Sequence, residues 1–243
     1  ACYKSHRLDS LHNLMFEEDT IFYKLKDKKV DVDYEKDYNK TLEGKMIADE
    51  RFYPKELEMS FDPFIRHYER YFQCVKILGK IGRNEKWLDC ACGTGYGSNF
   101  LANFCESVVG YDIDSDTVEY ANREYKSKKI SFMHSLSKNN HDSYDVIFSV
   151  ETIEHMPESD ASVFLQTLKS LLKDDGALVI TTPIVPKTNY SPKNKFHDVE
   201  YSHEHFVDLL ASNGFEIDKT NFVTTTFTDG EVKDQGYYKC KKA

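Results

Sequence analysis

An acidic residue followed directly by a glycine loop is the first feature of the sequence with chemical meaning. The apolar run before Asp89 gives way to CACGTGYG, which has glycine at every second position from Gly93. Glycine permits positive φ and lets the backbone approach a ligand closely. Asp112 lies about twenty residues beyond the loop, at the end of the next apolar segment, where an acid can bind ribose hydroxyls. The pattern indicates a site for a nucleoside-containing ligand.

The acid ahead of the loop separates two classes of such ligand. A dinucleotide places its pyrophosphate on a helix N-terminus and prefers the pattern GxGxxG. The loop here reads GTGYGS, so its third glycine falls one position early. Asp89 would repel a pyrophosphate but suits an ammonium group and a sulfonium. S-adenosylmethionine (SAM) carries both, together with a ribose, and the residues therefore favour SAM over NAD.

Histidines and acids farther along the chain suggest how an acceptor could be activated. Imidazole has a suitable pKa for removing a proton from a hydroxyl group, and His155 and His197 are the candidate bases. Glu151 and Glu154 could orient a base or an acceptor. An amine acceptor that is already deprotonated needs no base, so hydroxyl and amine both stay open.

No metal site is expected from the sequence. The six cysteines form no spaced framework and contain no CxxC pair, so they are expected to be reduced, buried thiols. His203 and His205 are two residues apart and diverge on a helix. The three histidines of this short stretch, His197, His203 and His205, are therefore expected to face solvent or substrate.

These residues lie between strands and helices that alternate along the chain. Helical spacing is expected over 61–78, 96–105, 115–125, 161–172 and 203–214, the fourth of these being closed by Asp174, Asp175 and Gly176. Strands are expected over 86–91, 107–113, 129–135, 144–151 and 177–183, with two more at 215–220 and within 222–240. Alternation of this kind predicts a mainly parallel sheet with helices on both faces. Ligands of such sheets bind outside the carboxyl ends of the strands.

Length and composition limit the organisation of the protein. The 243 residues are enough for one large α/β domain, expected over 61–243, with an appendage. Residues 1–60 are charged and weakly periodic, which predicts an arm or lid. No apolar run approaches the length of a membrane span, and residues 1–40 lack a signal-peptide pattern, so a cytoplasmic protein is expected.

The formal net charge is −9. Nucleic-acid backbones are bound by clustered Lys and Arg, so a small-molecule acceptor is the expected partner.

Four segments in order resemble one protein family. LDCACGTGYGS resembles motif I of class I SAM-dependent methyltransferases, while YDIDSDTVEYA, YDVIFSVETIEHM and GALVITTP resemble the second motif, the fourth motif and the fifth strand of that family. NKFHDVEYSHEHFVDLLASNGF is similar to a segment of methyltransferases that act on small molecules, quinone precursors and surface sugars. The resemblance spans 65–218. It implies a Rossmann-like class I methyltransferase fold with a seven-stranded, mainly parallel sheet, and methyl transfer from SAM, which leaves S-adenosylhomocysteine (SAH).

The resemblance also implies which residues surround SAM. The positions expected to contact it are Tyr68, Asp89, Ala91, Gly93, Gly95, Tyr96, Asp112, Ile113, Ser135, Leu136, Ser149 and Val150. Asp89 and the loop backbone would hold the methionine part, Asp112 the ribose, and Ile113 would pack on adenine. Ser135 stands where the family often has an acid near the adenine amino group. Glu151 would lie under the sulfonium, with His155 beyond it.

The acceptor stays open between several classes. The Asn/Asp-Pro-Pro-Tyr/Phe motif of nucleic-acid amino methyltransferases is absent from the sequence. ERFYP at 50–54, ahead of HYERY, is similar to the front of some methyltransferases of surface-polysaccharide clusters, which favours a sugar hydroxyl. Another small metabolite, such as a quinone precursor or an amine, is the alternative. An NAD-dependent oxidoreductase and a SAM-binding module without turnover are alternatives from other classes. A monomer and a homodimer both stay open.

Overall fold

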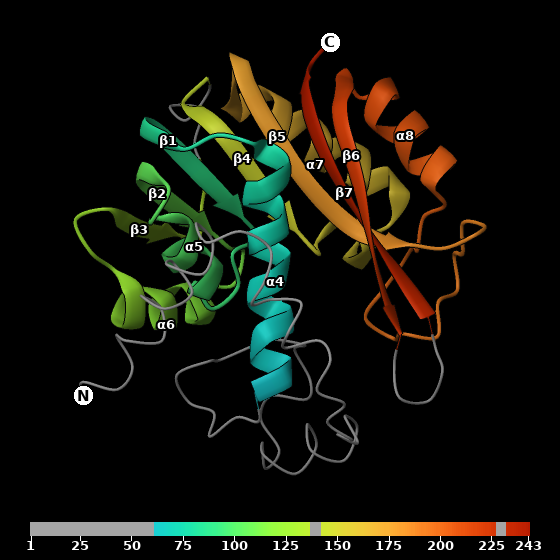
Figure 1. The fold of residues 1–243 in the computed structure, drawn as a ribbon, viewed down its shortest axis with the longest axis horizontal. Coiled ribbons are helices and arrows are strands. Elements are labelled where there is room, and N and C mark those ends of the chain that lie inside the picture. The colour runs from blue at the N-terminus through green and yellow to red at the C-terminus, as the bar shows by residue number, and fades with distance from the viewer. Residues whose placement is uncertain (1–60, 137–141, 227–231) are drawn as a thin grey trace. The chain divides into compact units, whose positions relative to one another are not determined.

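A computed structural model describes residues 61–136, 142–226 and 232–243 (Figure 1). The arm expected over 1–60 lies outside these residues and stays a prediction. The described part of the chain forms strands and helices in the alternating order that the sequence predicts. Among the described helices, none is both long and apolar enough to span a membrane.

The described residues form one seven-stranded sheet. Its strands, in chain order, are β1 (Gly82–Cys90), β2 (Cys105–Tyr111), β3 (Ile130–Met133), β4 (Tyr144–Val150), β5 (Leu172–Ile184), β6 (Phe215–Thr226) and β7 (Val232–Lys242). The order across the sheet is β3-β2-β1-β4-β5-β7-β6. The pairs from β3 to β5 are parallel, whereas β7 runs antiparallel to both β5 and β6. The predicted mainly parallel, seven-stranded sheet is confirmed.

Helices cover both faces of this sheet. They are α4 (Phe61–Leu78), α5 (Tyr96–Leu101), α6 (Ser115–Tyr125), α7 (Glu158–Leu171) and α8 (His203–Ser212), with a short 3-10 helix, η2 (Ile153–His155). In Figure 1, α4 crosses in front of the sheet and α7 lies behind it. The predicted covering of both faces is therefore confirmed.

Local sequence explains where several helices begin and end. Gly79, which has a φ of 72°, follows the last residue of α4 and reverses the chain. The Asp114 carboxylate accepts hydrogen bonds from the N–H groups of Asp116 and Thr117 and so caps α6. The Ser202 hydroxyl accepts from the N–H group of His205 at the start of α8.

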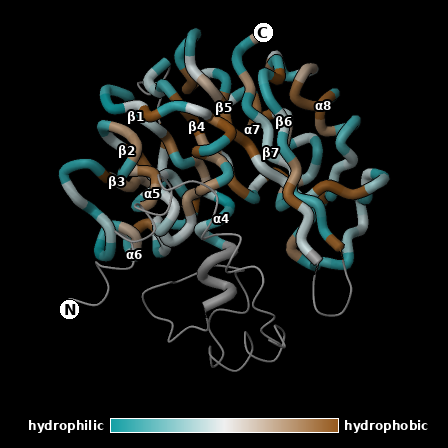
Figure 2. The backbone as a smooth tube through the Cα atoms, viewed as in Figure 1, coloured by the Kyte–Doolittle hydropathy of each residue, from teal (hydrophilic) through white to brown (hydrophobic). Residues whose placement is uncertain are grey.

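Apolar side chains from α7 and α8 share one core with the sheet. Leu165 and Leu168 of α7 and Phe206 and Leu210 of α8 are completely buried. They pack with sheet residues such as Ile147 in the same cluster. Figure 2 shows hydrophobic residues gathered on the central strands and hydrophilic ones on the connecting loops. Burial of this apolar surface is the main stabilising term that holds the layers together.

The strand order creates a switch point next to β1. The chain passes from β1 to β2 and β3 on one side and then returns to β4 on the other side of β1. In an open parallel sheet, ligands bind at the carboxyl ends of the strands next to such a reversal. Asp89 pairs with Phe148 and Cys90 with Ser149. The residues that follow β1 and β4 therefore leave the sheet side by side.

The end of α7 differs from the sequence-based prediction. We expected Asp174, Asp175 and Gly176 to close this helix, but it ends at Leu171 and all three residues lie within β5. Tyr144 pairs with Leu172, and the next pair is Val146 with Ala177, so the polar residues form an irregularity in the strand. Leu172 is completely buried and pairs with Tyr144 of β4, and this pairing begins the strand.

The final two strands also differ in their bounds from the prediction. We expected one strand over 215–220 and another within 222–240, but β6 continues to Thr226 and β7 begins at Val232. The two strands pair antiparallel from Phe215–Lys242 to Thr226–Val232. The pairing therefore extends along the whole of β6, from Phe215 to Thr226.

Candidate functional site

The residues directly after β1 and β4 have unusual backbone conformations. Ala91 follows β1 with a φ of 62°, and Glu151 follows β4 with a φ of 53°. Residues other than glycine seldom adopt positive φ, and such strain gathers at functional sites. Both residues lie at the carboxyl edge of the sheet, at the switch point between β1 and β4. The candidate site is therefore built at this edge.

The glycine loop is tied to the tip of β2 through Asp112. Oδ2 of Asp112 accepts a hydrogen bond of 2.9 Å from the N–H group of Gly93, and Oδ1 accepts one of 3.0 Å from the backbone N–H group of Asp114. A Cβ atom placed on Gly93 would meet no other atom within 4 Å. The Ile113 side chain, beside Asp112, is 82% exposed. The structure thus places a buried carboxylate next to an exposed apolar side chain and to empty space at the loop.

Asp89 lies in a buried layer and contacts two helices. Its carboxylate is completely buried and accepts hydrogen bonds from the Ser98 hydroxyl of α5 at 2.7 Å and from the Tyr71 hydroxyl of α4 at 3.2 Å. Burial raises the pKa of Asp89 to about 7, although these two hydrogen bonds lower it. Ser98 was missed by the sequence analysis; it lies nine residues beyond Asp89, on the helix that the glycine loop opens.

Aromatic rings cover this layer from the side of α4. Tyr96 makes edge contacts with Tyr68 and Tyr71, at ring-centroid distances of 5.4 and 5.7 Å. Its hydroxyl also lies 3.1 Å from Nδ1 of His67. A Cβ atom on Gly97 would overlap the ring of Tyr71. Tyr68 of α4 and Tyr96 of α5, both expected to contact SAM, are thus packed against one another.

The end of β4 holds a polar cluster around Glu151. Oε1 of Glu151 accepts hydrogen bonds from the Thr181 hydroxyl at 2.7 Å and from the Gln235 amide. Oε2 lies 3.6 Å from the Arg70 guanidinium of α4. The sequence analysis missed Arg70, although Cys74 four residues later lies on the same helical face and is completely buried. A charged residue on the apolar stripe of a helix was the signal available.

Other expected SAM contacts follow the ends of β3 and β4. Ser135 is exposed and Leu136 is partly buried just after β3. Ser149 and Val150 are buried in the last two positions of β4. Within the described residues, the Ser149 hydroxyl has no hydrogen-bond partner. Buried hydroxyl groups nearly always have one, so this group is suited to contact a bound molecule.

The two candidate bases, His155 and His197, come together although 42 positions separate them in the chain. Their rings lie edge to face with centroids 5.0 Å apart. Nδ1 of His155 lies 2.8 Å from the carbonyl oxygen of Phe196, and Nδ1 of His197 lies 3.0 Å from Oε1 of Glu200. We expected a carboxylate to orient the ring of His155, but the Phe196 carbonyl does so.

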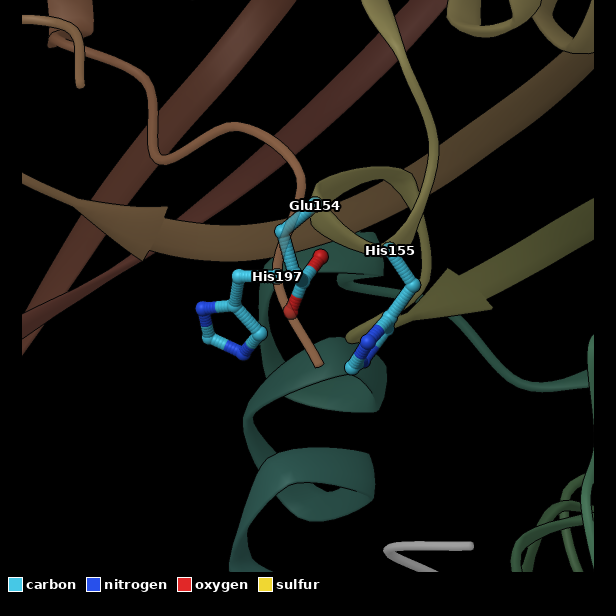
Figure 3. A group of neighbouring side chains, drawn as sticks. All are labelled: Glu154, His155 and His197. Atoms are coloured by element: carbon cyan, nitrogen blue, oxygen red, sulfur yellow. The ribbon is translucent and has the colours of Figure 1, made fainter. Parts of the chain in front are cut away.

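Glu154 lies between these two histidines (Figure 3). Its side chain is 1% exposed, and Oε2 accepts a hydrogen bond of 3.2 Å from the Thr182 hydroxyl. Burial raises the pKa of Glu154 well above its usual range, and the nearby Glu151 carboxylate adds to this effect. One potential ligand atom from each of Glu154, His155 and His197 lies within 4.8 Å of the others.

His203 and His205, the other two histidines near His197 in the sequence, contact other residues and not this cluster. Nδ1 of His203 lies 3.0 Å from the Tyr238 hydroxyl, while Nε2 of His205 lies 3.3 Å from a carboxylate oxygen of Glu158. Their different partners agree with the expected divergence of two side chains that lie two positions apart on a helix.

Comparison with known proteins places this chain in a family. A family profile described as a methyltransferase domain matches residues 65–220, more than half of the chain. A probable S-adenosylmethionine-dependent methyltransferase of Mycolicibacterium smegmatis is 28% identical over 137 residues, which are 55% of this chain and 52% of that protein. A ubiquinone biosynthesis O-methyltransferase of Actinobacillus pleuropneumoniae is 30% identical over 117 residues, 44% of this chain and 48% of that protein. The chain spans about half the length of these curated relatives.

Solved structures show the same architecture. A magnesium protoporphyrin IX methyltransferase from Synechocystis PCC 6803, with bound SAH, superposes with a TM-score of 0.59. The superposition covers 77% of this chain and 89% of that one at 21% sequence identity, a level at which the likeness concerns the fold. Profile, relatives and fold agree with the strand order and the glycine loop described above. The chain belongs to the family of class I SAM-dependent methyltransferases, with their Rossmann-like fold.

Proposed function

We propose that this protein transfers a methyl group from SAM to a hydroxyl group of a small molecule. The observation that carries this proposal is that the glycine loop, Asp112 and His155 follow the carboxyl ends of neighbouring strands, β1, β2 and β4, and that His197, from the loop between β5 and α8, packs against His155. A nucleoside site and a proton acceptor are thus built on one edge of one sheet.

The loop and the tip of β2 fit SAM. Empty space beside Gly93 leaves room for a ligand against the backbone. Asp112 holds the loop in place and carries the lone pairs to accept from ribose hydroxyls. Ile113 offers an exposed apolar surface for adenine. When bound, SAM supplies an activated methyl group on sulfur and leaves as SAH.

The histidine pair supplies what a hydroxyl acceptor needs. The Phe196 carbonyl accepts from Nδ1–H of His155, so Nε2 is the nitrogen that carries the lone pair. Nε2 accepts the hydroxyl proton, and the acceptor oxygen forms the new bond to the methyl carbon with its lone pair. Alignment of the two reactants supplies much of the remaining acceleration. Glu151, held by Thr181 and Gln235, is placed to orient the acceptor.

Two kinds of hydroxyl acceptor are favoured by different observations. The relative named as a ubiquinone biosynthesis O-methyltransferase supports a phenolic hydroxyl of a quinone precursor. The similarity of ERFYP and HYERY to methyltransferases of surface-polysaccharide clusters supports a sugar hydroxyl. The relatives and the histidine pair both favour oxygen over an amine nitrogen.

Calorimetry followed by a product assay tests the proposal. We expect SAM and SAH to bind the full chain and NAD not to bind. Incubation with SAM and panels of catechols, sugars and amines should then give a product one methyl group heavier, detected by mass spectrometry, from a catechol or a sugar. Binding of NAD without SAM would indicate an oxidoreductase. SAM binding without transfer to any panel member would favour a module without turnover.

A further inference from the structure

We propose that Glu154, His155 and His197 bind a divalent transition-metal ion. The three residues come from two segments, the 3-10 helix η2 and the loop before α8. The N–H groups of Asp198 and Val199 both donate to the carbonyl oxygen of Glu154, at 2.7 and 3.2 Å. The backbone therefore fixes one segment against the other, and the cluster does not depend on chance contacts between side chains.

Both histidines are held in the way that metal ligands usually are. A ligating imidazole generally donates its second ring N–H to a carbonyl or a carboxylate, which fixes its tautomer and its orientation. Nδ1 of His155 has the Phe196 carbonyl as its partner, and Nδ1 of His197 has the Glu200 carboxylate. In each ring Nε2 is then the nitrogen with the lone pair. Two imidazoles prepared in this manner, with centroids 5.0 Å apart, form the nitrogen part of a site.

Glu154 supplies the negative charge. Its buried carboxylate has a hydroxyl donor in Thr182 and a second carboxylate, Glu151, in its neighbourhood. A buried carboxylate is costly unless it is paired with a cation or ligates a metal. A divalent ion between the two rings would compensate the charge of Glu154. Figure 3 shows the carboxylate between the imidazoles, where such an ion would join all three side chains.

The geometry requires only a small adjustment. The potential ligand atoms lie within 4.8 Å of one another, whereas ligands at bonds of about 2.0–2.2 Å from one ion are roughly 3–4 Å apart. His155 is exposed, so a rotation of its side chain can close the difference. Three protein ligands leave at least one coordination position for water or for an acceptor oxygen, as in catalytic sites.

The donor set indicates the class of metal. Imidazole nitrogen suits zinc, copper, iron and nickel, while magnesium, calcium and manganese prefer oxygen ligands. Two imidazoles and one carboxylate are also the protein ligands of some catalytic zinc sites. We therefore expect zinc to bind in preference to manganese and magnesium.

A metal here would activate the acceptor, a role that rests on the proposed function. A hydroxyl oxygen bound to the ion has a lowered pKa and releases its proton to solvent water. The resulting alkoxide or phenolate forms the O–CH3 bond with an oxygen lone pair, and the electron pair of the S–CH3 bond stays on sulfur. Charge and atoms balance with SAH and a methyl ether as products. With the ion bound, His155 and His197 act as its ligands; without it, Nε2 of His155 is the base of the proposed function.

Metal binding can be tested without turnover. The untagged full chain, cleared of metal with a chelator, is titrated calorimetrically with Zn²⁺, Mn²⁺ and Mg²⁺. We expect about one equivalent of Zn²⁺ to bind, more tightly than Mn²⁺ or Mg²⁺, and His155→Ala, His197→Ala and Glu154→Gln each to weaken Zn²⁺ binding at least tenfold. His205→Ala, which removes a histidine beside Glu158 and outside the cluster, should leave the affinity unchanged. Equal Zn²⁺ affinity in wild type and all three cluster variants would overturn the site, as would no binding of Zn²⁺.

Two further measurements separate this inference from the proposed function. SAM titration of the same variants reports on folding and on the cofactor site, because none of the three residues belongs to it. A variant that still binds SAM but no longer binds the metal supports the metal site. Because Glu154 is buried, Glu154→Gln could be unstable, and the exposed residue's variant His155→Ala is then sufficient for this test. If the wild type binds metal but not SAM, the proposed function fails and the metal site stands. If it binds metal and methylates equally well after chelation, activation of the acceptor by the metal is overturned.

Discussion

The N–H group of Gly93 donates a 2.9 Å hydrogen bond to Oδ2 of Asp112, across nineteen positions of sequence. This bond joins the loop after β1 to the tip of β2. Asp112 therefore has two expected tasks, which are to position the glycine loop and to accept hydrogen bonds from ribose.

Substitution of Asp112 should weaken SAM binding. Asp112→Ala removes the acceptor for ribose and the anchor of Gly93, and we expect a loss of roughly 1.5–3 kcal/mol, about tenfold to a hundredfold in affinity. Isothermal titration with SAM measures the change, and circular dichroism checks that the fold persists. Asp112→Asn keeps one acceptor oxygen and should lie between wild type and alanine. An unchanged dissociation constant in the alanine variant would remove Asp112 from the SAM site.

Asp89 should make stability depend on pH. Burial raises its folded-state pKa to about 7, above the unfolded value of about 3.9, so the folded protein binds more protons between these values. Its contribution to stability is therefore fully present below about pH 4 and is lost as pH rises to about 7, at up to ~1.4 kcal/mol per pH unit. Urea unfolding of wild type and Asp89→Asn should show that the free energy of unfolding of the variant rises relative to that of wild type as the pH increases from 5 to 8. A constant difference between the two proteins would contradict the shifted pKa.

The same carboxylate should make SAM affinity depend on pH. If Asp89 supports the ammonium group or the sulfonium, SAM binds the ionised form better, and its affinity should rise as pH increases through about 7. Below that pKa the dependence can reach about tenfold per pH unit. Asp89→Asn should bind SAM more weakly at pH 8 and show a flat profile. Parallel profiles for the two proteins would place SAM away from Asp89.

Gly97 should be required for packing rather than for the loop conformation. A Cβ atom there would overlap the Tyr71 ring, and overpacking of this kind costs about 1–3 kcal/mol. We expect Gly97→Ala to lower the midpoint of thermal unfolding by several degrees. Adding Tyr71→Ala removes the ring, so the double variant should be more stable than the sum of the two single losses predicts. Strictly additive losses would mean that the two residues do not interact.

His155 should control turnover without controlling SAM binding. If the acceptor is a hydroxyl, His155→Ala should lower kcat by ~10²–10⁴-fold, the usual contribution of general-base help, and leave SAM affinity nearly unchanged. Wild-type kcat should fall at acid pH, because protonated imidazole neither accepts a proton nor ligates a metal. The variant should lose this dependence, while His205→Ala should retain it. Full kcat with an intact acid limb in His155→Ala would assign the role to another group, with His197 tested next.

The sequence by itself determined the layout of the cofactor half of the site. Apolar segments alternate with helical spacing from Trp87 onward, the glycines follow the first strand, and Asp112 follows the second. These features are readable because each strand, its following loop and the next helix are contiguous in the chain. A glycine with positive φ or a carboxylate at a strand end can be predicted from its neighbours in the chain, whatever position the strand takes in the sheet. The roles of these residues toward SAM stay predictions.

Only the tertiary structure decided how distant residues combine. The pairing of His155 with His197 arises from the backbone bonds between η2 and the loop at 198–199, and Glu151 meets Arg70 and Gln235 from segments far apart in sequence. The position of β7 between β5 and β6 is likewise set by the tertiary structure. Neither periodicity nor spacing reports such contacts, because they depend on how strands are ordered across the sheet, and local propensities do not set that order.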